Sequence, residues 1–475
     1  MKTYLKLSIV FLFGLLMGSC NEYLDVKPED KYLEEQVYSS EEGINNLLNG
    51  VYINLAENNL YGGQLTMSTV ELLAQRYNVS NANHDWYDHG HYLYDETSVR
   101  ASFEGIWTSA YEVVINLNSL LEGIEKYSTL PEWKKNIIKG EALGLRAMIQ
   151  FDLLRLFGPV YLTNASDLSI PYYTEAKAEA NSFLPATDVV NMVLSDLNEA
   201  ETLLENDPII TNGIVEDPEQ PFYSFRNLRL NYYGIKALQA RVHLYAGNTQ
   251  EALTTAQFVI DETSGLLPWT EPSAVISSDN RDRVFSSEII FAVQNLSLYT
   301  RHNNLFSNNL TDAKILAPNT TRIEQVFESN ESDYRFNSSW VVPSDGVRSY
   351  RTFTKYADVT DKDLSFRFMQ PIVRKTEMYY IVAETTPDVA LAKQYLDEVR
   401  YNRGLVALDE DVDISEEIRK EYMKEFYGEG QLFFYYKRNN IEAIPDGNST
   451  SSSRTVSMGV ENYVVPIPES ETKFQ

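Results

Sequence analysis

Apolar residues recur along most of the chain at the three- and four-residue spacing of an amphipathic helix. Ser39 and Ser40 precede Glu41 and Glu42, which is N-cap chemistry, and the apolar positions that follow predict a helix ending at Leu55. The chain is predicted to be mainly α-helical. Further helices are predicted over residues 103–124, 131–157 (ended by Gly158-Pro159), 187–204, 228–245, 250–260, 377–384 and 389–400, and a last one over about 416–427.

Two pairs of these helices are joined by short turns. The turn from Gly247 to Leu253 lies between the helices 228–245 and 250–260 and resembles the turn of a tetratricopeptide repeat. The repeats are degenerate, so we expect tetratricopeptide-like helical hairpins forming a curved frame and not a regular solenoid. The helices 377–384 and 389–400 form a second pair of this kind. Small residues that let the first pair approach closely are Ala240, Gly247, Ala252 and Ala256.

The helical period fades between about residues 265 and 370, where Pro, Asn, Ser and Asp are frequent. Short β-like stretches, 288–293 and 340–342, lie within this region. We expect an irregular, loop-rich lobe with little β-structure, carried on a helical frame. The frame covers about 39–262 and 371–440, residues 76–99 and 446–455 form long loops, and residues 20–475 make up a single domain.

The N-terminus has the composition of a secretion signal. Lys2 and Lys6 are the only charges before residue 20, and the apolar run 7–17 is shorter than the about 20 residues that a transmembrane helix needs. We therefore expect residues 1–19 to be a signal peptide.

The signal ends in Met17-Gly18-Ser19-Cys20, which resembles the lipobox of bacterial lipoproteins. That resemblance implies cleavage before Cys20 and diacylation of its thiol, which would anchor the protein durably to a membrane. Cys20 is the only cysteine, so intrachain disulfides are excluded. Glu22 and Asp25 are similar to the acidic export signal of Bacteroidetes-type surface lipoproteins.

The charge balance excludes a nucleic-acid-binding protein. The sequence has 40 basic and 68 acidic residues, a net charge of −28. Binding to phosphate backbones requires clustered Lys and Arg, whereas an acidic surface favours solubility.

Sequence motifs of enzymes are absent. The chain has no Gly-x-Ser-x-Gly, phosphate loop, His-Glu-x-x-His or paired-cysteine zinc spacing. His84, His89 and His91 are three of the five histidines, but they lie on an unpatterned loop, and metal sites need convergent geometry. We expect neither an enzyme nor a cofactor or metal.

Several segments, in order, resemble the SusD/RagB family of outer-membrane nutrient-binding lipoproteins. Two departures are Asn402-Arg403, where the family usually has Arg-Ala, and Tyr435-Tyr436, where it often has Asp. The matching segments are Cys20-Asn21-Glu22-Tyr23-Leu24-Asp25, Glu141-Ala142 to Leu153, Phe157-Gly158-Pro159-Val160, Asn231-Tyr232, Ala237 to Tyr245, Leu396 to Arg400 with Gly404-Leu405, Glu421 to Gln431 with Lys437-Arg438, and Val465-Pro466-Ile467-Pro468.

The resemblance implies a lipid-anchored protein of the outer membrane, exposed at the cell surface. It also implies a SusC-like, TonB-dependent β-barrel transporter as the partner, with this chain as the lid over its extracellular mouth. The charged residues of the matching segments have a structural explanation in ion pairs between packed helices. These residues are Glu141, Arg146, Arg241, Arg400, Glu429 and Arg438.

Polar loops rich in aromatic residues supply candidate ligand contacts. Flat rings cover the apolar faces of sugars, and Asn, Asp, Arg and His bind the hydroxyl groups. We expect Trp86 to be the leading platform, faced by a second wall around Trp269, Tyr299 and Trp340. The full candidate set is Tyr77, Asn81, Asn83, Trp86, Tyr87, Tyr92, Tyr94, Trp269, Tyr299, Arg301 and Trp340, with His84, Asp88 and His302 beside them.

Two functions are compatible with these features. The first is binding of an oligosaccharide and its delivery to the transporter, and the second is binding of a peptide or another nutrient, as in the RagB branch. A carbohydrate-active enzyme is the weaker third alternative, because no pair of carboxylates stands out.

Overall fold

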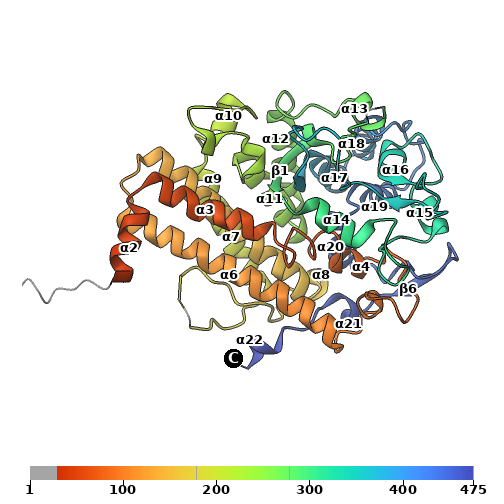
Figure 1. Cartoon of the computed structure of the whole chain (residues 1–475), viewed down its shortest axis with the longest axis horizontal. Helices are drawn as coiled ribbons and strands as arrows, with labels where there is room; N and C mark the ends of the chain where they lie inside the picture. The colour runs from red at the N-terminus through yellow and green to blue at the C-terminus, as the bar shows by residue number, and fades with distance from the viewer. Residues whose placement is uncertain (1–28, 178, 278, 474–475) are drawn as a thin grey trace, which may run out of the picture.

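The computed structural model describes residues 29–177, 179–277 and 279–473, and within them helices dominate over three small two-stranded sheets (Figure 1). The predicted signal peptide 1–19 and the predicted lipid attachment site Cys20 lie outside the described residues. Among the described helices, none has both the length and the apolar character needed to cross a membrane.

The observed helices agree closely with most of the predicted ranges. The long ones are α3 (Glu41–Leu55), α6 (Thr97–Tyr127), α7 (Glu132–Phe157), α9 (Ala186–Leu203), α11 (Tyr232–Tyr245), α12 (Thr249–Glu262), α17 (Lys375–Thr385), α18 (Val389–Tyr401) and α19 (Ile414–Glu425). The short ones are α2 (Glu29–Tyr38), α4 (Thr69–Leu73), α5 (Tyr87–Gly90), α8 (Tyr161–Asn164), α10 (Pro208–Asn212), α13 (Pro272–Ile276), α14 (Leu298–Phe306), α15 (Thr320–Val326), α16 (Tyr334–Ser339), α20 (Gln431–Arg438), α21 (Val460–Tyr463) and α22 (Glu469–Thr472).

Capping side chains set the ends of these helices. The Ser40 hydroxyl accepts the Gly43 N–H at 3.0 Å, which confirms the predicted start of α3. The predicted start of the 228–245 helix was four residues too early. Asn231 caps α11 by accepting the Gly234 N–H at 3.0 Å, so the helix begins only at Tyr232.

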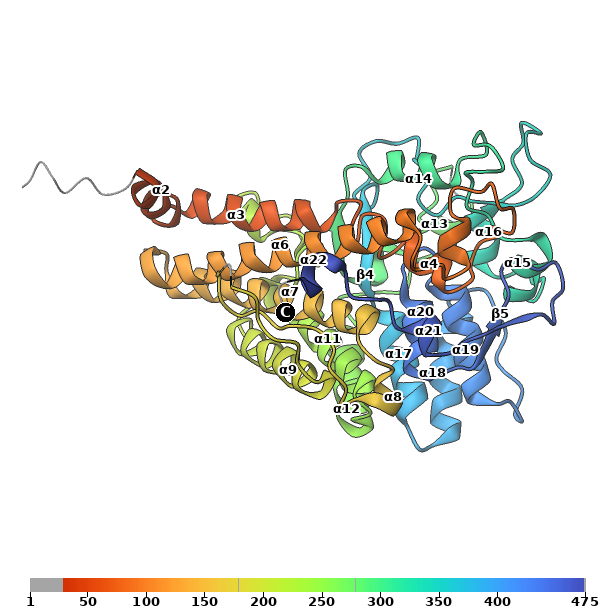
Figure 2. The ribbon, with the colours of Figure 1, turned by 90° about the horizontal axis from the view of Figure 1, so that it is seen from below.

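The long helices form a continuous packed series. α3 packs on α6, α6 on α7 and α7 on α9, and these four lie side by side at one end of the molecule (Figure 2). The series continues through α11, α12, α17 and α18, and the two predicted hairpins are α11–α12 and α17–α18. The prediction of a mainly helical fold built from such pairs is confirmed.

The lobe contains both predicted β-like stretches. β1 (Ile289–Gln294) pairs antiparallel with β4 (Met369–Arg374), and β2 (Trp340–Val341) pairs with β3 (Thr352–Phe353). The 446–454 loop joins the hairpin strands β5 (Ala443–Pro445) and β6 (Thr455–Ser457). The lobe is less irregular than expected, because α13 to α16 also lie in it (Figure 1).

The prediction that 416–427 is the last helix was wrong. α20, α21 and α22 follow α19. The six residues from Leu432 to Lys437 of α20 are all buried, so the middle of this short helix has no side open to solvent.

Glu425 on α19 is the centre of a buried ion-pair network. Its carboxylate accepts hydrogen bonds from Arg335 of α16 (2.8 Å), Arg403 after α18 (2.8 Å) and Arg374 of β4. The side chains of Glu425 and Arg403 are both 0% exposed. Burial pushes the pKa of Glu425 up, but the three guanidinium charges hold it well below its usual range.

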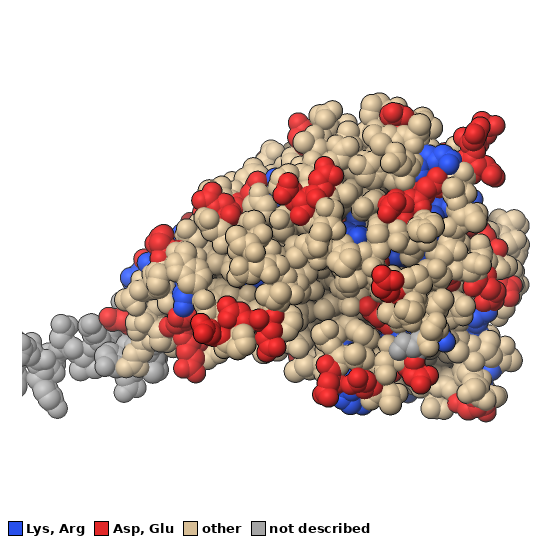
Figure 3. Space-filling model, turned by 90° about the horizontal axis from the view of Figure 1, so that it is seen from above, with Lys and Arg blue, Asp and Glu red and all other residues tan. Residues whose placement is uncertain are grey.

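The motif residues expected in ion pairs all take part in them, but Glu141 does not pair with Arg146, nor Glu429 with Arg438. Glu141 pairs with Arg226 and Arg229, and Glu429 pairs with Arg374. The remaining pairs are Arg146–Asp196, Arg241–Glu377, Arg400–Glu421 and Arg438–Glu384. Outside, the surface is mainly acidic, and Figure 3 shows Asp and Glu spread over one face with fewer Lys and Arg between them.

Replacing Glu425 with Gln tests the network. Glu425→Gln leaves three buried guanidinium groups short of a counter-charge, so it should lower the free energy of unfolding by about 3–5 kcal/mol in chemical denaturation. Glu416→Gln on the same helix is the control, because Glu416 pairs with Arg419 at the surface and its loss should cost at most about 1 kcal/mol. Equal, small losses in both variants would contradict the account.

Candidate ligand-binding site

The loop of residues 78–94 is fastened to the lobe by backbone hydrogen bonds. The Asn78 N–H donates to the Ala317 carbonyl and the Asp85 N–H to the Ala313 carbonyl, each at 2.8 Å. His84 Nε2 lies 3.1 Å from the Ile315 carbonyl oxygen. The loop is therefore held in a defined place beside the segment that follows α14.

Trp86 and Tyr87 lie half-buried at the surface of this loop. The Trp86 ring meets the His89 ring edge-on, with centroids 4.9 Å apart, and the Tyr87 ring stacks on His91 at 4.0 Å. Each ring is thus supported on one side while part of its surface stays open to solvent. This is the arrangement that stacking on a sugar face requires.

Two asparagines precede the rings in the sequence. Asn81 and Asn83 are exposed, and Asn81 Oδ1 accepts the Asn83 N–H at 2.9 Å. The Asn81 carbonyl oxygen in turn accepts the His84 N–H, so Asn81 shapes the turn, while the Asn83 amide remains available at the surface.

Tyr77 and Trp340 are core residues, so the expectation that they face a ligand does not hold. Both are 1% exposed. The Tyr77 hydroxyl donates to the Met67 carbonyl at 2.9 Å, and both rings pack around Tyr427, with centroids 6.0 and 4.7 Å from it. A ring enclosed on all sides offers no face to a sugar.

Tyr92 and Tyr94 fix the loop to neighbouring segments through their hydroxyl groups and do not point into solvent. The Tyr92 hydroxyl donates to the Leu73 carbonyl at 2.8 Å, and the Tyr94 hydroxyl donates to the Asn462 carbonyl at 2.6 Å. Burial raises the pKa of both phenols. They connect the loop to the end of α4 and to α21.

The predicted second wall is divided between two parts of the molecule. Trp269 packs on the frame, where its Nε1–H donates to Glu398 of α18 at 3.0 Å and Lys375 of α17 lies over its ring. Tyr299 lies on α14 in the lobe, and Arg301, on the same helix, is 3.4 Å from Glu57. Within the described residues, no contact joins Trp269 to the 78–94 loop.

Tyr299 borders a small pocket of about 270 Å³ that we call the lobe pocket. Its basic side chains were not recognised from the sequence, because arginines with and without a carboxylate partner look alike there. The residues that line it include Arg281, Arg283, Leu298, Tyr299, Lys355 and Arg367.

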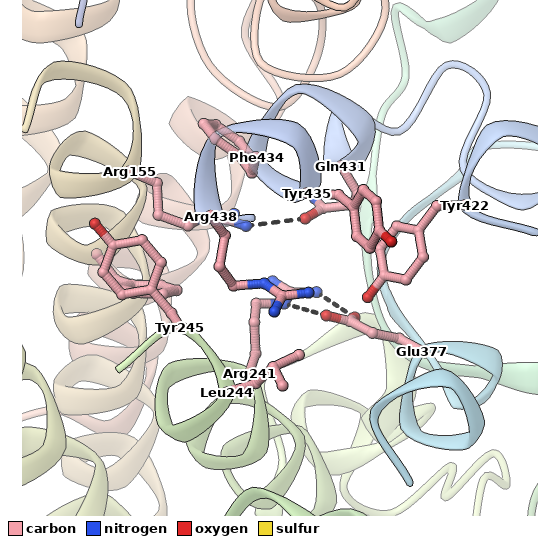
Figure 4. A pocket seen from close by; sticks show the side chains of 11 residues that line it. Arg155, Arg241, Leu244, Tyr245, Glu377, Tyr422, Gln431, Phe434, Tyr435 and Arg438 are labelled. Atoms are coloured by element: carbon pink, nitrogen blue, oxygen red, sulfur yellow. Dashed lines mark hydrogen bonds and ion pairs between the residues drawn. The ribbon is translucent and has the colours of Figure 1, made fainter. Parts of the chain in front are cut away.

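A second pocket, of about 350 Å³, lies between α7, α11, α17, α19 and α20, and we call it the frame pocket (Figure 4). Its three cations are all neutralised, as Arg155 pairs with Asp152, Arg241 with Glu377 and Arg438 with Glu384. Because no cation in its wall lacks a carboxylate partner, this pocket is explained by packing between helices.

The three histidines of the 84–91 segment do not converge. His84 contacts the Ile315 carbonyl, His89 the Ser102 hydroxyl and His91 the Tyr87 carbonyl. Within the described residues there is no group of three or more His, Cys, Asp or Glu placed to hold a metal ion.

Two family models match the chain in sequence. One, described as "Starch-binding associating with outer membrane", matches residues 22–212, and the other, described as "SusD family", matches residues 300–473. The chain belongs to the SusD/RagB family. The resemblance found in the sequence is thereby confirmed, and the two matched ranges include the 78–94 loop and residues 300–306 of α14, whereas Leu298, Tyr299 and residues 281–283 lie outside them.

SusD/RagB relatives in other bacteria are distant in sequence. A SusD-like protein of Formosa agariphila is 27% identical over 264 residues, which are 54% of this chain and 45% of that protein. A SusD-like protein of Bacteroides ovatus is 26% identical over 205 residues, 41% of this chain and 34% of that protein. The matches therefore span about half or less of the length of these relatives.

Solved structures share the SusD fold over almost the whole chain. A SusD superfamily protein of Bacteroides thetaiotaomicron has a TM-score of 0.71 at 21% identity, covering 91% of this chain and 97% of that one. A Bacteroides vulgatus protein has 0.72 at 22% identity, covering 92% and 97%. A laminarin-binding SusD-like protein has 0.65 at 20% identity, covering 92% and 98%.

Proposed function

We propose that this SusD/RagB protein is a cell-surface lipoprotein that binds an oligosaccharide and passes it to a TonB-dependent outer-membrane transporter. The observation that carries the proposal is the pair of partly exposed rings of Trp86 and Tyr87, each packed on a histidine, on a loop that also carries the exposed Asn83. Rings with neighbouring amides match the apolar faces and hydroxyl edges of sugars.

The comparisons support a glycan in preference to a peptide. One family model carries starch binding in its description, and one structural neighbour is a laminarin-binding protein. The role is binding and not catalysis, since the site residues are rings and amides without a converging acid and base.

Truncating Trp86 tests the site. Affinity gels that contain laminarin and a panel of other neutral and acidic polysaccharides first identify a ligand. Trp86→Ala should weaken binding of that ligand at least tenfold, roughly 1.4 kcal/mol. The ring is half-buried, so the melting temperature should also fall to a moderate extent.

Trp133→Ala is the matched control for that experiment. Trp133 is 44% exposed at the start of α7 and packs on Tyr223, so its loss should affect stability but leave binding intact. If Trp86→Ala lowers the melting temperature without changing affinity, Trp86 is a packing residue. If the protein binds peptides and no polysaccharide, the alternative function, uptake of peptides, is favoured.

The anchor is tested at Cys20, the only cysteine of the chain. Cys20→Ala should abolish metabolic labelling by a fatty-acid analogue and move the protein from the membrane to the soluble fraction, because the acyl chains supply the membrane affinity. Cys20→Ser is a second variant that separates loss of the thiol from loss of a polar side chain. Labelling that persists in both variants would exclude lipidation at this residue.

The transporter is tested by purification from detergent-solubilised outer membranes. A tagged wild-type protein should retain a β-barrel protein of roughly twice its own 54.4 kDa mass under mild conditions. The Cys20→Ala variant, added back as soluble protein, shows whether the contact needs the anchor. Repeated recovery without any barrel protein would count against the proposed partner.

A further inference from the structure

Arg281 and Arg283 stand out in the lobe pocket because neither has a carboxylate partner within the described residues. Each makes only a single contact with the end of α16. Arg281 Nη1 donates to the Asn337 carbonyl at 3.4 Å, and Arg283 Nε donates to the Ser338 carbonyl at 3.2 Å. The Nη1 and Nη2 groups of Arg283 make no hydrogen bond to any described residue.

The carboxylate of Asp282, which lies between the two arginines in the sequence, bonds to other groups. Asp282 is 4% exposed, and its Oδ2 accepts both the Ser286 N–H (2.9 Å) and the Ser286 hydroxyl (2.7 Å). Asp282 therefore caps the following turn and forms no ion pair with either neighbour. The two guanidinium groups remain uncompensated in their own segment.

The opposite walls of the lobe pocket hold two further cations, and both are already paired with carboxylates. Lys355 pairs with Glu429, and Arg367 pairs with Asp358 at 3.0 Å, so each of these two cations has its own counter-charge. No Asp or Glu lines the pocket itself. The uncompensated charge of the site is thus about that of the two arginines.

This arrangement is costly for the free protein. Burial and the charge of Arg281 together lower the pKa of Arg283 to about 10. The chain has 68 acidic residues against 40 basic ones, and most buried arginines in it meet a carboxylate. Two half-buried arginines without a carboxylate partner do not stabilise the folded chain. Their presence points to an anion that comes from outside the chain.

We propose that the lobe pocket binds an oxyanion, a carboxylate or a sulfate, carried by a sugar of the bound polysaccharide. This inference rests on the proposed glycan-binding function and adds the substrate class. The free Nη groups of Arg283 can form the paired hydrogen bonds that guanidinium makes with planar and tetrahedral oxyanions. The pocket encloses too little free space for a sugar ring, so it would take the substituent alone.

The lobe pocket and the Trp86 rings can serve one ligand. Leu298 and Tyr299, in the first turn of α14, line the pocket, and the segment after α14 is where the 78–94 loop is attached. A nine-residue helix is about 13 Å long, so an oligosaccharide of several residues could span both places. The Tyr299 ring at the pocket mouth would lie beside the charged sugar.

The test uses the double variant Arg281→Gln/Arg283→Gln and a control that removes two basic residues elsewhere. The control is Lys139→Gln/Arg454→Gln, whose side chains pair with Glu125 and Asp446 outside the pocket. The first readout is the melting temperature of each full-length protein in sodium sulfate against sodium chloride at equal ionic strength. Sulfate stabilises proteins in general, so all three proteins should gain stability gradually with concentration. Wild type and control should show an additional gain that saturates, and the arginine variant should lack this saturable part.

The second readout compares charged and neutral forms of the same polymers in affinity gels. Polygalacturonate is compared with its methyl ester, and a sulfated galactan with its desulfated form, which distinguishes carboxylate from sulfate. Wild type should retain at least one charged form about tenfold more tightly than its neutral counterpart. Arg281→Gln/Arg283→Gln should remove that preference while leaving affinity for the neutral form unchanged.

The outcomes separate this inference from the proposed function. Neutral polymers bound through Trp86, with no arginine-dependent response to sulfate or to either charged polymer, would overturn the anion pocket and leave glycan binding intact. If sulfate stabilises the protein through the two arginines but no polymer binds, the pocket is an anion site. The proposal that a glycan carries the anion would then be rejected. A sulfate response equal in all three proteins would show an adventitious ion only and overturn the proposal.

Discussion

Glu425 receives three arginines in a region from which water is excluded, and this contact ties separate parts of the chain together. Arg335 comes from the lobe, Arg374 from β4 and Arg403 from the turn after α18. Burying a guanidinium group without counter-charges is costly, so Glu425 stabilises the packing of the three parts that carry these arginines. Arg403 occupies a position where the chain departs from its family, and it also pairs with Glu288 before β1.

The network extends to the loop that carries the candidate binding rings. Directly after α19, the Tyr427 hydroxyl donates to the Arg76 carbonyl at 2.6 Å, and the Gly430 N–H donates to Glu71 of α4 at 2.9 Å. Arg76 in turn donates to the Met423 carbonyl of α19. The start of the 78–94 loop is therefore fixed by the buried core, while Trp86 and Tyr87 lie further along it, nearer to solvent. A rigid base with partly open rings suits a binding surface.

The sequence predicted the long helices well because one face of each is buried and the other is polar, as in α3 and α6. It missed α20, whose middle is buried all round, and it placed Tyr77 and Trp340 at the surface. Polar residues near them in the sequence suggested exposure. Both rings instead pack against Tyr427, which lies far away in sequence. Burial by distant segments, and the lack of a partner for Arg283, can be seen only once the chain is folded.

The proposed ligand site lies where the 78–94 loop meets the lobe near α14, and not in the pocket between the long helices of the frame. Hydrogen exchange with and without the polysaccharide selected in affinity gels tests this directly, because bound ligand slows exchange where backbone amides are covered or stiffened. The account predicts slower exchange in peptides from residues 81–94 and 281–306, with α9, α11 and α12 unchanged. Slower exchange confined to α7, α11 and α20, around the frame pocket, would contradict it.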